Sequence, residues 1–76
     1  MREEIFKLCA EILPNIDFES SDTLVDDGTL DSLSIMTLVQ ELSLEYDVKF
    51  DMANLEASQL NSIDAIVNTV KQLQNR

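Results

Sequence analysis

The sequence of 76 residues contains no histidine and no tryptophan, and it has one cysteine, one glycine and one proline. Without histidine the chain lacks the commonest general base and the commonest protein ligand for metal ions. A single cysteine, Cys9, excludes an internal disulfide and, with no histidine present, an ordinary zinc site. A single glycine excludes a glycine-rich phosphate-binding loop. These absences argue against an autonomous enzyme and against a metal site.

Basic residues are also scarce. The sequence has 5 Lys and Arg but 15 Asp and Glu, which gives a net charge of −10. No basic cluster is present, so we expect no nucleic acid as a partner. The charge instead favours protein partners with basic patches. No apolar run approaches the length of a membrane span, and no secretory signal is visible, so we expect a cytoplasmic protein without a membrane span.

The size of the chain predicts one small domain, residues 1–76, with a marginal core. Apolar residues make up 45% of the sequence, which predicts folding rather than disorder. Nothing in the sequence demands more than a monomer, and a monomer is what we expect.

Hydrophobic periodicity predicts three main helices, over residues 2–13, 33–46 and 62–74, and a short helical piece within 54–60. Pro14 ends the first helix because it disfavours helical geometry at the residue before it. Cys9 lies on the apolar face of that helix, so we expect it to be buried and inert. The fold class expected is therefore all-α: a small four-helix bundle, with three main helices and one short helix, and a long first loop.

The first loop, residues 14–31, is long for a compact domain, but apolar side chains spaced along it can pin it to the helices. These are Ile16, Phe18, Leu24, Val25 and Leu30. The loop is acidic, yet aligning Gly28 with the glycine of a calcium-binding EF-hand places Thr23, Val25 and Ser34 at ligand positions, so the motif fails. A solvated acidic surface is the preferred interpretation, and loose binding of divalent ions by the clustered carboxylates is the alternative. After the second helix we expect an extended linker with Phe50 buried.

The stretch Asp27–Leu33 contains the residue to which we assign function, Ser32. Gly28 allows a positive φ angle and so predicts a turn. Asp31 is a good helix N-cap, which would place the Ser32 hydroxyl at a helix N-terminus, where an attached phosphodiester is favoured. A carboxylate next in sequence does not make Ser32 a catalytic nucleophile, so we expect another enzyme to modify it. Plain helix capping is the alternative explanation for Asp31-Ser32.

Two leucines of the second helix fall outside its apolar stripe. The stripe contains Ile35, Leu38, Val39, Leu42 and Tyr46, with Met36 at its border. Leu33 and Leu44 lie on the opposite side, beside Thr37 and Gln40. This pair is a candidate docking surface, although scattered exposed leucines without function are also common.

Across nearly its full length the sequence resembles the acyl carrier and peptidyl carrier protein family. The resemblance rests on the run from Leu24 to Leu33 with Asp31-Ser32-Leu33, and on Leu38-Val39, Leu42, Tyr46, Phe50 and the segment Ser62–Ile66. It implies that 4′-phosphopantetheine is attached to Ser32 from coenzyme A by a separate phosphopantetheinyl transferase. The terminal thiol of that group then holds an acyl or aminoacyl group as a thioester. The carrier itself catalyses nothing.

The resemblance also implies roles for the neighbours of Ser32. Asp31 matches an acidic residue that helps the transferase to recognise the site, and Leu33 matches an exposed apolar residue used in docking. The docking face expected on this basis comprises Leu33, Met36, Thr37, Glu41 and Leu44. Its partners are the transferase and the enzymes that activate or transfer acyl or aminoacyl groups, with basic or apolar docking patches.

The second helix departs from the pattern in which fatty-acid carriers resemble one another. Ser34, Thr37 and Ser43 are uncharged at positions where that pattern has acids, and Leu44 is apolar, while Glu41, Glu45 and Asp47 keep some charge. The uncharged positions are similar to those of D-alanyl carrier proteins and of standalone carriers in specialised pathways. The pathway is left open among fatty-acid, polyketide, nonribosomal-peptide and D-alanylation-type pathways. We therefore expect a specialised acyl or aminoacyl carrier first and a carrier of general fatty-acid biosynthesis second. The alternative from another class is a helical interaction module that never receives the prosthetic group.

Overall fold

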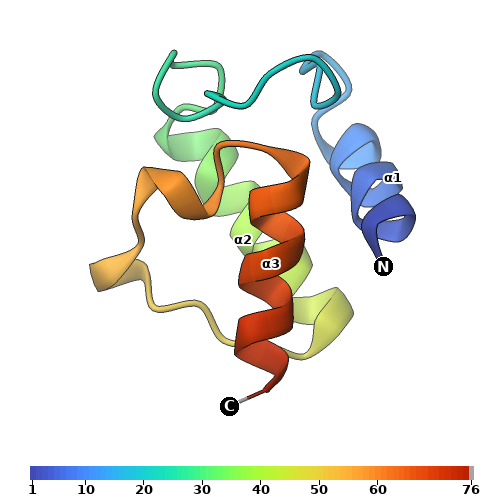
Figure 1. Ribbon diagram of the computed structural model, residues 1–76, viewed down its shortest axis with the longest axis vertical. Helices are drawn as coiled ribbons and strands as arrows, with labels where there is room; N and C mark the ends of the chain where they lie inside the picture. Colours follow the sequence, from blue (N-terminus) through green and yellow to red (C-terminus); the bar gives the residue numbers. More distant parts are fainter. Residues whose placement is uncertain (76) are drawn as a thin grey trace.

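The computed structural model describes residues 1–75, and within this range the chain is helical with no strand, which confirms the all-α fold class (Figure 1). The elements are α1 (Arg2–Ile12), α2 (Ser32–Tyr46), the 3₁₀ turns η1 (Met52–Asn54) and η2 (Ala57–Gln59), and α3 (Ile63–Gln74). The three main helices begin and end within one residue of the predicted ranges.

Helix α1 ends one residue earlier than predicted. Leu13 has φ −131° and ψ 69°, which is not helical, because Pro14 follows it. Its amide still donates a hydrogen bond to the Cys9 carbonyl at 2.9 Å, which closes the last turn. Cys9 is fully buried, as expected from its place on the apolar face.

The loop from 13 to 31 is irregular but fastened to the bundle, as the spacing of its apolar residues predicts. Phe18, Leu24 and Leu30 are buried, while Ile16 and Val25 are half-buried against the core. Each of these side chains removes apolar surface from water and offsets part of the entropy lost on ordering the loop.

The segment between α2 and α3 differs in detail from the prediction. The predicted short helix within 54–60 is replaced by two 3₁₀ turns, because Leu55 and Glu56 between them are extended, with ψ values of 125° and 151°. Leu60 is buried, but Met52 is 48% exposed and does not anchor the segment. The linker before the turns has no regular secondary structure, and Phe50 is buried as predicted.

A single hydrophobic core joins all three helices and the loops. Each main helix packs against the other two. The buried apolar residues are Ile5, Cys9, Phe18, Leu24, Leu30, Leu38, Val39, Leu42, Phe50, Leu60, Ile63, Ile66, Val67 and Val70. Thr69 is also buried, and its hydroxyl donates to the carbonyls of Gln59 and Ala65, each at 2.9 Å. The burial of this polar side chain is therefore compensated by hydrogen bonds.

The helices run in two directions. Helices α2 and α3 both begin at the top of the view in Figure 1 and end at the bottom, while α1 runs the opposite way. The first turns of α2 and α3 lie toward the same end of the molecule, and the first turn of α1 contacts the start of α3 through the Arg2–Asp64 ion pair. Ser32 lies at this end because it is the first residue of α2.

Two leucines on α2 test the assignment of its buried and exposed faces. Leu38 is fully buried, whereas Leu44 is 73% exposed. We expect Leu38→Ala to lower the free energy of unfolding by about 2–5 kcal/mol, because it leaves a cavity in the core. Leu44→Ala should change it by no more than about 0.5 kcal/mol. Urea unfolding followed by circular dichroism measures both, and equal effects would contradict the assignment.

Candidate functional site

A turn at Gly28 brings the loop into α2. Gly28 has φ +82°, in the left-handed region, and its amide donates to the Val25 carbonyl at 3.1 Å. A Cβ atom built at this position would meet nothing within 4 Å, so the turn needs glycine for its backbone conformation and not for space. Two residues further on, the Leu30 amide donates to the Leu24 carbonyl at 2.8 Å.

The Asp27 carboxylate stabilises this turn by accepting hydrogen bonds from residues on both sides of it. It accepts hydrogen bonds from the Thr29 amide at 2.8 Å and from the hydroxyls of Thr23 and Ser21 at 3.2 and 3.4 Å. Hydrogen bonding from the side chain and the amide of Thr29 holds the pKa of Asp27 below its ordinary value. The carboxylate that the sequence suggested as part of a solvated acidic surface thus also has a structural role.

Asp31 is the N-cap of α2, as predicted. Its backbone is extended, with φ −85° and ψ −179°, and its carboxylate accepts from the Ser34 amide at 2.8 Å. Hydrogen bonding from the backbone of Ser34 is the main reason that the pKa of Asp31 is lowered. A carboxylate that is ionised at neutral pH therefore lies one residue before Ser32.

Ser32 is exposed and opens a helix of 15 residues. The aligned peptide dipoles favour negative charge at this end of α2. Because the Asp31 carboxylate faces the Ser34 amide, it is committed to capping the helix and not to activating the neighbouring hydroxyl. The site thus offers an accessible hydroxyl next to a fixed anion, which suits a group transferred by another enzyme, and a phosphodiester-linked arm fits an exposed serine at a helix N-terminus.

Three of the five residues predicted to form a docking face are exposed on α2, and the other two, Thr37 and Glu41, are half-buried. Leu33 and Leu44 are each 73% exposed and Met36 is 60% exposed. Thr37 and Glu41 lie beside them, and the Thr37 hydroxyl donates back to the Leu33 carbonyl at 3.0 Å. The structure thus brings three large apolar side chains to the exposed side of the helix that begins with Ser32.

The sequence interpretation missed the role of Asn61. The N-cap of α3 is the next residue, Ser62, whose hydroxyl accepts from the Ala65 amide at 3.0 Å. The Asn61 side chain instead reaches the loop before α2, where it accepts from the amides of Val25 and Asp26. No local pattern could have revealed this contact, because it joins residues 36 and 35 positions apart.

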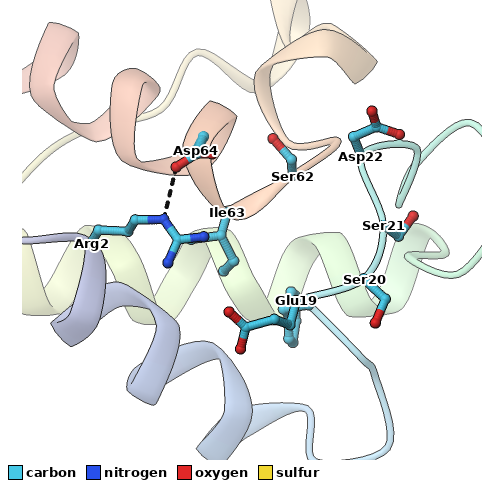
Figure 2. Close-up of a pocket in the computed structure, with 9 residues that line it drawn as sticks. Arg2, Glu19, Ser20, Ser21, Asp22, Ser62, Ile63 and Asp64 are labelled. Carbon is cyan, nitrogen blue, oxygen red and sulfur yellow. Dashed lines mark hydrogen bonds and ion pairs between the residues drawn. The ribbon is translucent and has the colours of Figure 1, made fainter.

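A polar hollow of about 340 Å³ lies between the start of α1, the first loop and the start of α3 (Figure 2). The Arg2 Nε atom donates to the Asp64 carboxylate at 2.8 Å across its edge. Ser32 is not among the residues that line it. Within residues 1–75, no group of three or more His, Cys, Asp or Glu side chains is arranged to hold a metal ion.

Among the helices that the structure describes, none combines the length and the apolar character needed to cross a membrane.

Comparison with known proteins shows that residues 3–70 match a protein family described as "PP-binding: Phosphopantetheine attachment site". The chain is also similar to a protein of Streptococcus uberis named "D-alanyl carrier protein". The two are 36% identical over 54 residues, which cover 71% of this chain and 68% of the relative. No solved structure matched the chain.

The hydrogen bonds to Asp27 and Asp31 predict how both carboxyls titrate. Their pKa values are lowered in the folded chain, so NMR titration should place both below the ordinary Asp value of about 3.9. The stability that they contribute is present above the unfolded-state pKa and is lost as the pH falls through the lower folded-state pKa.

The control is Asp31→Asn, which keeps a good N-cap without the charge. Its melting temperature should lie below that of the wild type at neutral pH, where the Asp31 charge contributes stability, and the difference should shrink as the pH falls through the Asp31 pKa. A folded-state pKa of Asp31 at or above the ordinary value would contradict the proposed cap.

Proposed function

The chain belongs to the family of carrier proteins with a phosphopantetheine attachment site, whose prosthetic group is covalent 4′-phosphopantetheine, and we propose that Ser32 is the residue that receives it. The observation that carries the proposal is the exposed Ser32 hydroxyl at the first position of α2, directly after the ionised cap Asp31. Residues 1–76 then act as one carrier domain.

In this proposal the chain is a covalent substrate of its partners and not a catalyst. The Ser32 oxygen forms a new bond to the phosphorus next to pantetheine in coenzyme A, adenosine 3′,5′-bisphosphate leaves, and the hydroxyl proton passes to a base. That base comes from the transferase, because the chain has no histidine and Asp31 already accepts from the Ser34 amide. The transferase recognises the negative charge of the Asp31 carboxylate next to Ser32. Once attached, the arm supplies a thiol that holds an acyl or aminoacyl group as a thioester.

We propose a specialised acyl or aminoacyl cargo, of the D-alanylation type, ahead of a general fatty-acid cargo. Two observations support this order: the relative named "D-alanyl carrier protein", and the uncharged Ser34, Thr37 and Ser43 on α2. Tethering raises the effective concentration of the cargo at each partner's active site. The same proposal makes the carrier a cytoplasmic monomer, in the compartment that supplies coenzyme A.

The docking face for these partners is Leu33, Met36, Thr37, Glu41 and Leu44. Its three exposed apolar side chains suit an apolar patch on the partner. The acids Glu41, Glu45 and Asp47 lie on α2 or at its end, and the chain carries a net charge of −10. Basic groups around the apolar patch would therefore speed the encounter and set its orientation.

The test is the intact mass of the chain after incubation with coenzyme A and a broad-specificity phosphopantetheinyl transferase. We expect the wild type to gain the mass of one phosphopantetheine and Ser32→Ala to gain none.

A second readout is the number of reactive thiols. Burial raises the pKa of the Cys9 thiol to about 12, so the native unmodified chain should react with no thiol reagent, and the modified chain should show one fast thiol.

Modification of Ser32→Ala would show that another residue carries the arm. If the wild type gains no mass while the same transferase modifies another carrier, the chain is instead the helical interaction module that the sequence left as an alternative.

Charge substitutions on α2 test the docking face. We expect Leu33→Glu and Leu44→Glu each to raise the KM of the transferase about tenfold, as loss of a central apolar contact costs on the order of 1–2 kcal/mol. The matched control is Gln40→Glu, which adds the same charge at an exposed position between the leucines without removing an apolar side chain. Steady-state kinetics measures all three, and equal effects in the three variants would make charge, and not apolar contact, the cause.

A further inference from the structure

The side chain of Asn61 fastens the loop that leads into Ser32. Its Oδ1 atom accepts hydrogen bonds from two successive amides, Val25 at 2.9 Å and Asp26 at 3.1 Å. Its Nδ2 atom donates to the Asp26 carboxylate at 3.0 Å. One primary amide thus makes three hydrogen bonds to two neighbouring loop residues.

These bonds require the chemistry of an asparagine. The group must accept from backbone N–H groups on one side and donate to a carboxylate on the other, and a primary amide does both at once. Aspartate has the acceptor but no donor, and its charge would face Asp26. Glutamine has both functions on a chain that is one carbon longer.

The backbone of Asn61 extends the same connection toward Ser32. Its carbonyl accepts from the Leu24 amide at 2.9 Å, and the Leu24 carbonyl accepts from the Leu30 amide at 2.8 Å. Leu30 immediately precedes Asp31, the N-cap of α2. Two backbone hydrogen bonds therefore connect Asn61 to the residue next to the cap of the helix that Ser32 opens.

Asn61 itself is held on both sides. Leu60 is buried in the core, and Ser62 caps α3. The start of α3 is thus a fixed support, and the loop of residues 24–31 is fastened to it. The two segments lie far apart in sequence but at the same end of the molecule (Figure 1).

We propose that Asn61 is a positioning residue for phosphopantetheine transfer: it holds the loop of residues 24–31 in the conformation that the transferase recognises. This inference rests on the proposed attachment to Ser32. Asn61 does not touch the reacting hydroxyl, so its loss leaves the chemistry of Ser32 unchanged. Loss of Asn61 lowers the fraction of chains whose loop has the conformation that the transferase binds. The KM for the transferase therefore rises by the inverse of that fraction, while kcat stays constant.

The primary variant is Asn61→Asp, which keeps the shape and the acceptor but replaces the donor with a charged oxygen that faces Asp26. We expect the KM for the transferase to rise about tenfold, the equivalent of one charge-assisted hydrogen bond, with kcat within about twofold of the wild type. Hydrogen exchange of the Val25, Asp26 and Leu30 amides should accelerate. That readout does not depend on modification, so it tests the loop separately from the function of Ser32.

Rescue by a second substitution separates positioning from a general loss of stability. In Asn61→Asp combined with Asp26→Asn, the donor and the acceptor change places, so the hydrogen bond between the two side chains re-forms. We expect the KM to return to within about threefold of the wild type. Asp26→Asn alone keeps the bond, now between two amides, and should have a smaller effect than Asn61→Asp.

Ser62→Ala is the matched control for stability. It removes the cap of α3 one residue away from Asn61, and the hydroxyl that it deletes bonds to the Ala65 amide and not to the loop. We expect its melting temperature to fall while its KM stays normal. A normal KM in Asn61→Asp, a KM that rises equally in Ser62→Ala, or a double variant no better than Asn61→Asp would each overturn the proposal. A wild type that is never modified would instead overturn the function proposed for Ser32.

Discussion

The attachment of the loop before α2 to the bundle is the constraint on which the site depends. The loop has no regular secondary structure, and its position comes from buried Leu24 and Leu30, joined by a hydrogen bond of 2.8 Å between their backbones. From this point Asp31 can cap α2, and Ser32 can open it with its hydroxyl in solvent. If Leu24 and Leu30 left the core, the loop would no longer hold Asp31 in position to cap α2. The orientation of the Ser32 hydroxyl would then no longer be defined.

Helix α2 combines two roles that usually conflict in so small a domain. One side contributes Leu38 and Leu42 to the core, while the other leaves Leu33 and Leu44 in water. Exposed leucines cost the fold little, because stability depends on the buried side. A marginal core can therefore keep an exposed apolar face on the helix that Ser32 opens. The high negative charge favours solubility in spite of that face.

Local physical chemistry was sufficient to predict the main helices, the cap at Asp31 and the exposed leucines, because periodicity and capping act within a few residues. The two 3₁₀ turns were missed because Leu55 and Glu56 are extended in a stretch without a breaker residue. Asp47, which ends α2 at φ +52°, was missed because sequence rules expect glycine there. The contacts of Asn61 and the burial of Thr69 depend on how α3 packs, which no local pattern contains.

The most direct test of the account is to locate the added group within the chain. The modified protein would be digested and its peptides fragmented in the mass spectrometer, so that Ser32 is distinguished from Ser34 and from the loop serines Ser20 and Ser21. We expect every modified fragment to carry phosphopantetheine on Ser32. Phosphopantetheine on any other serine would contradict it, because the exposed first residue of α2 would then not be the attachment site.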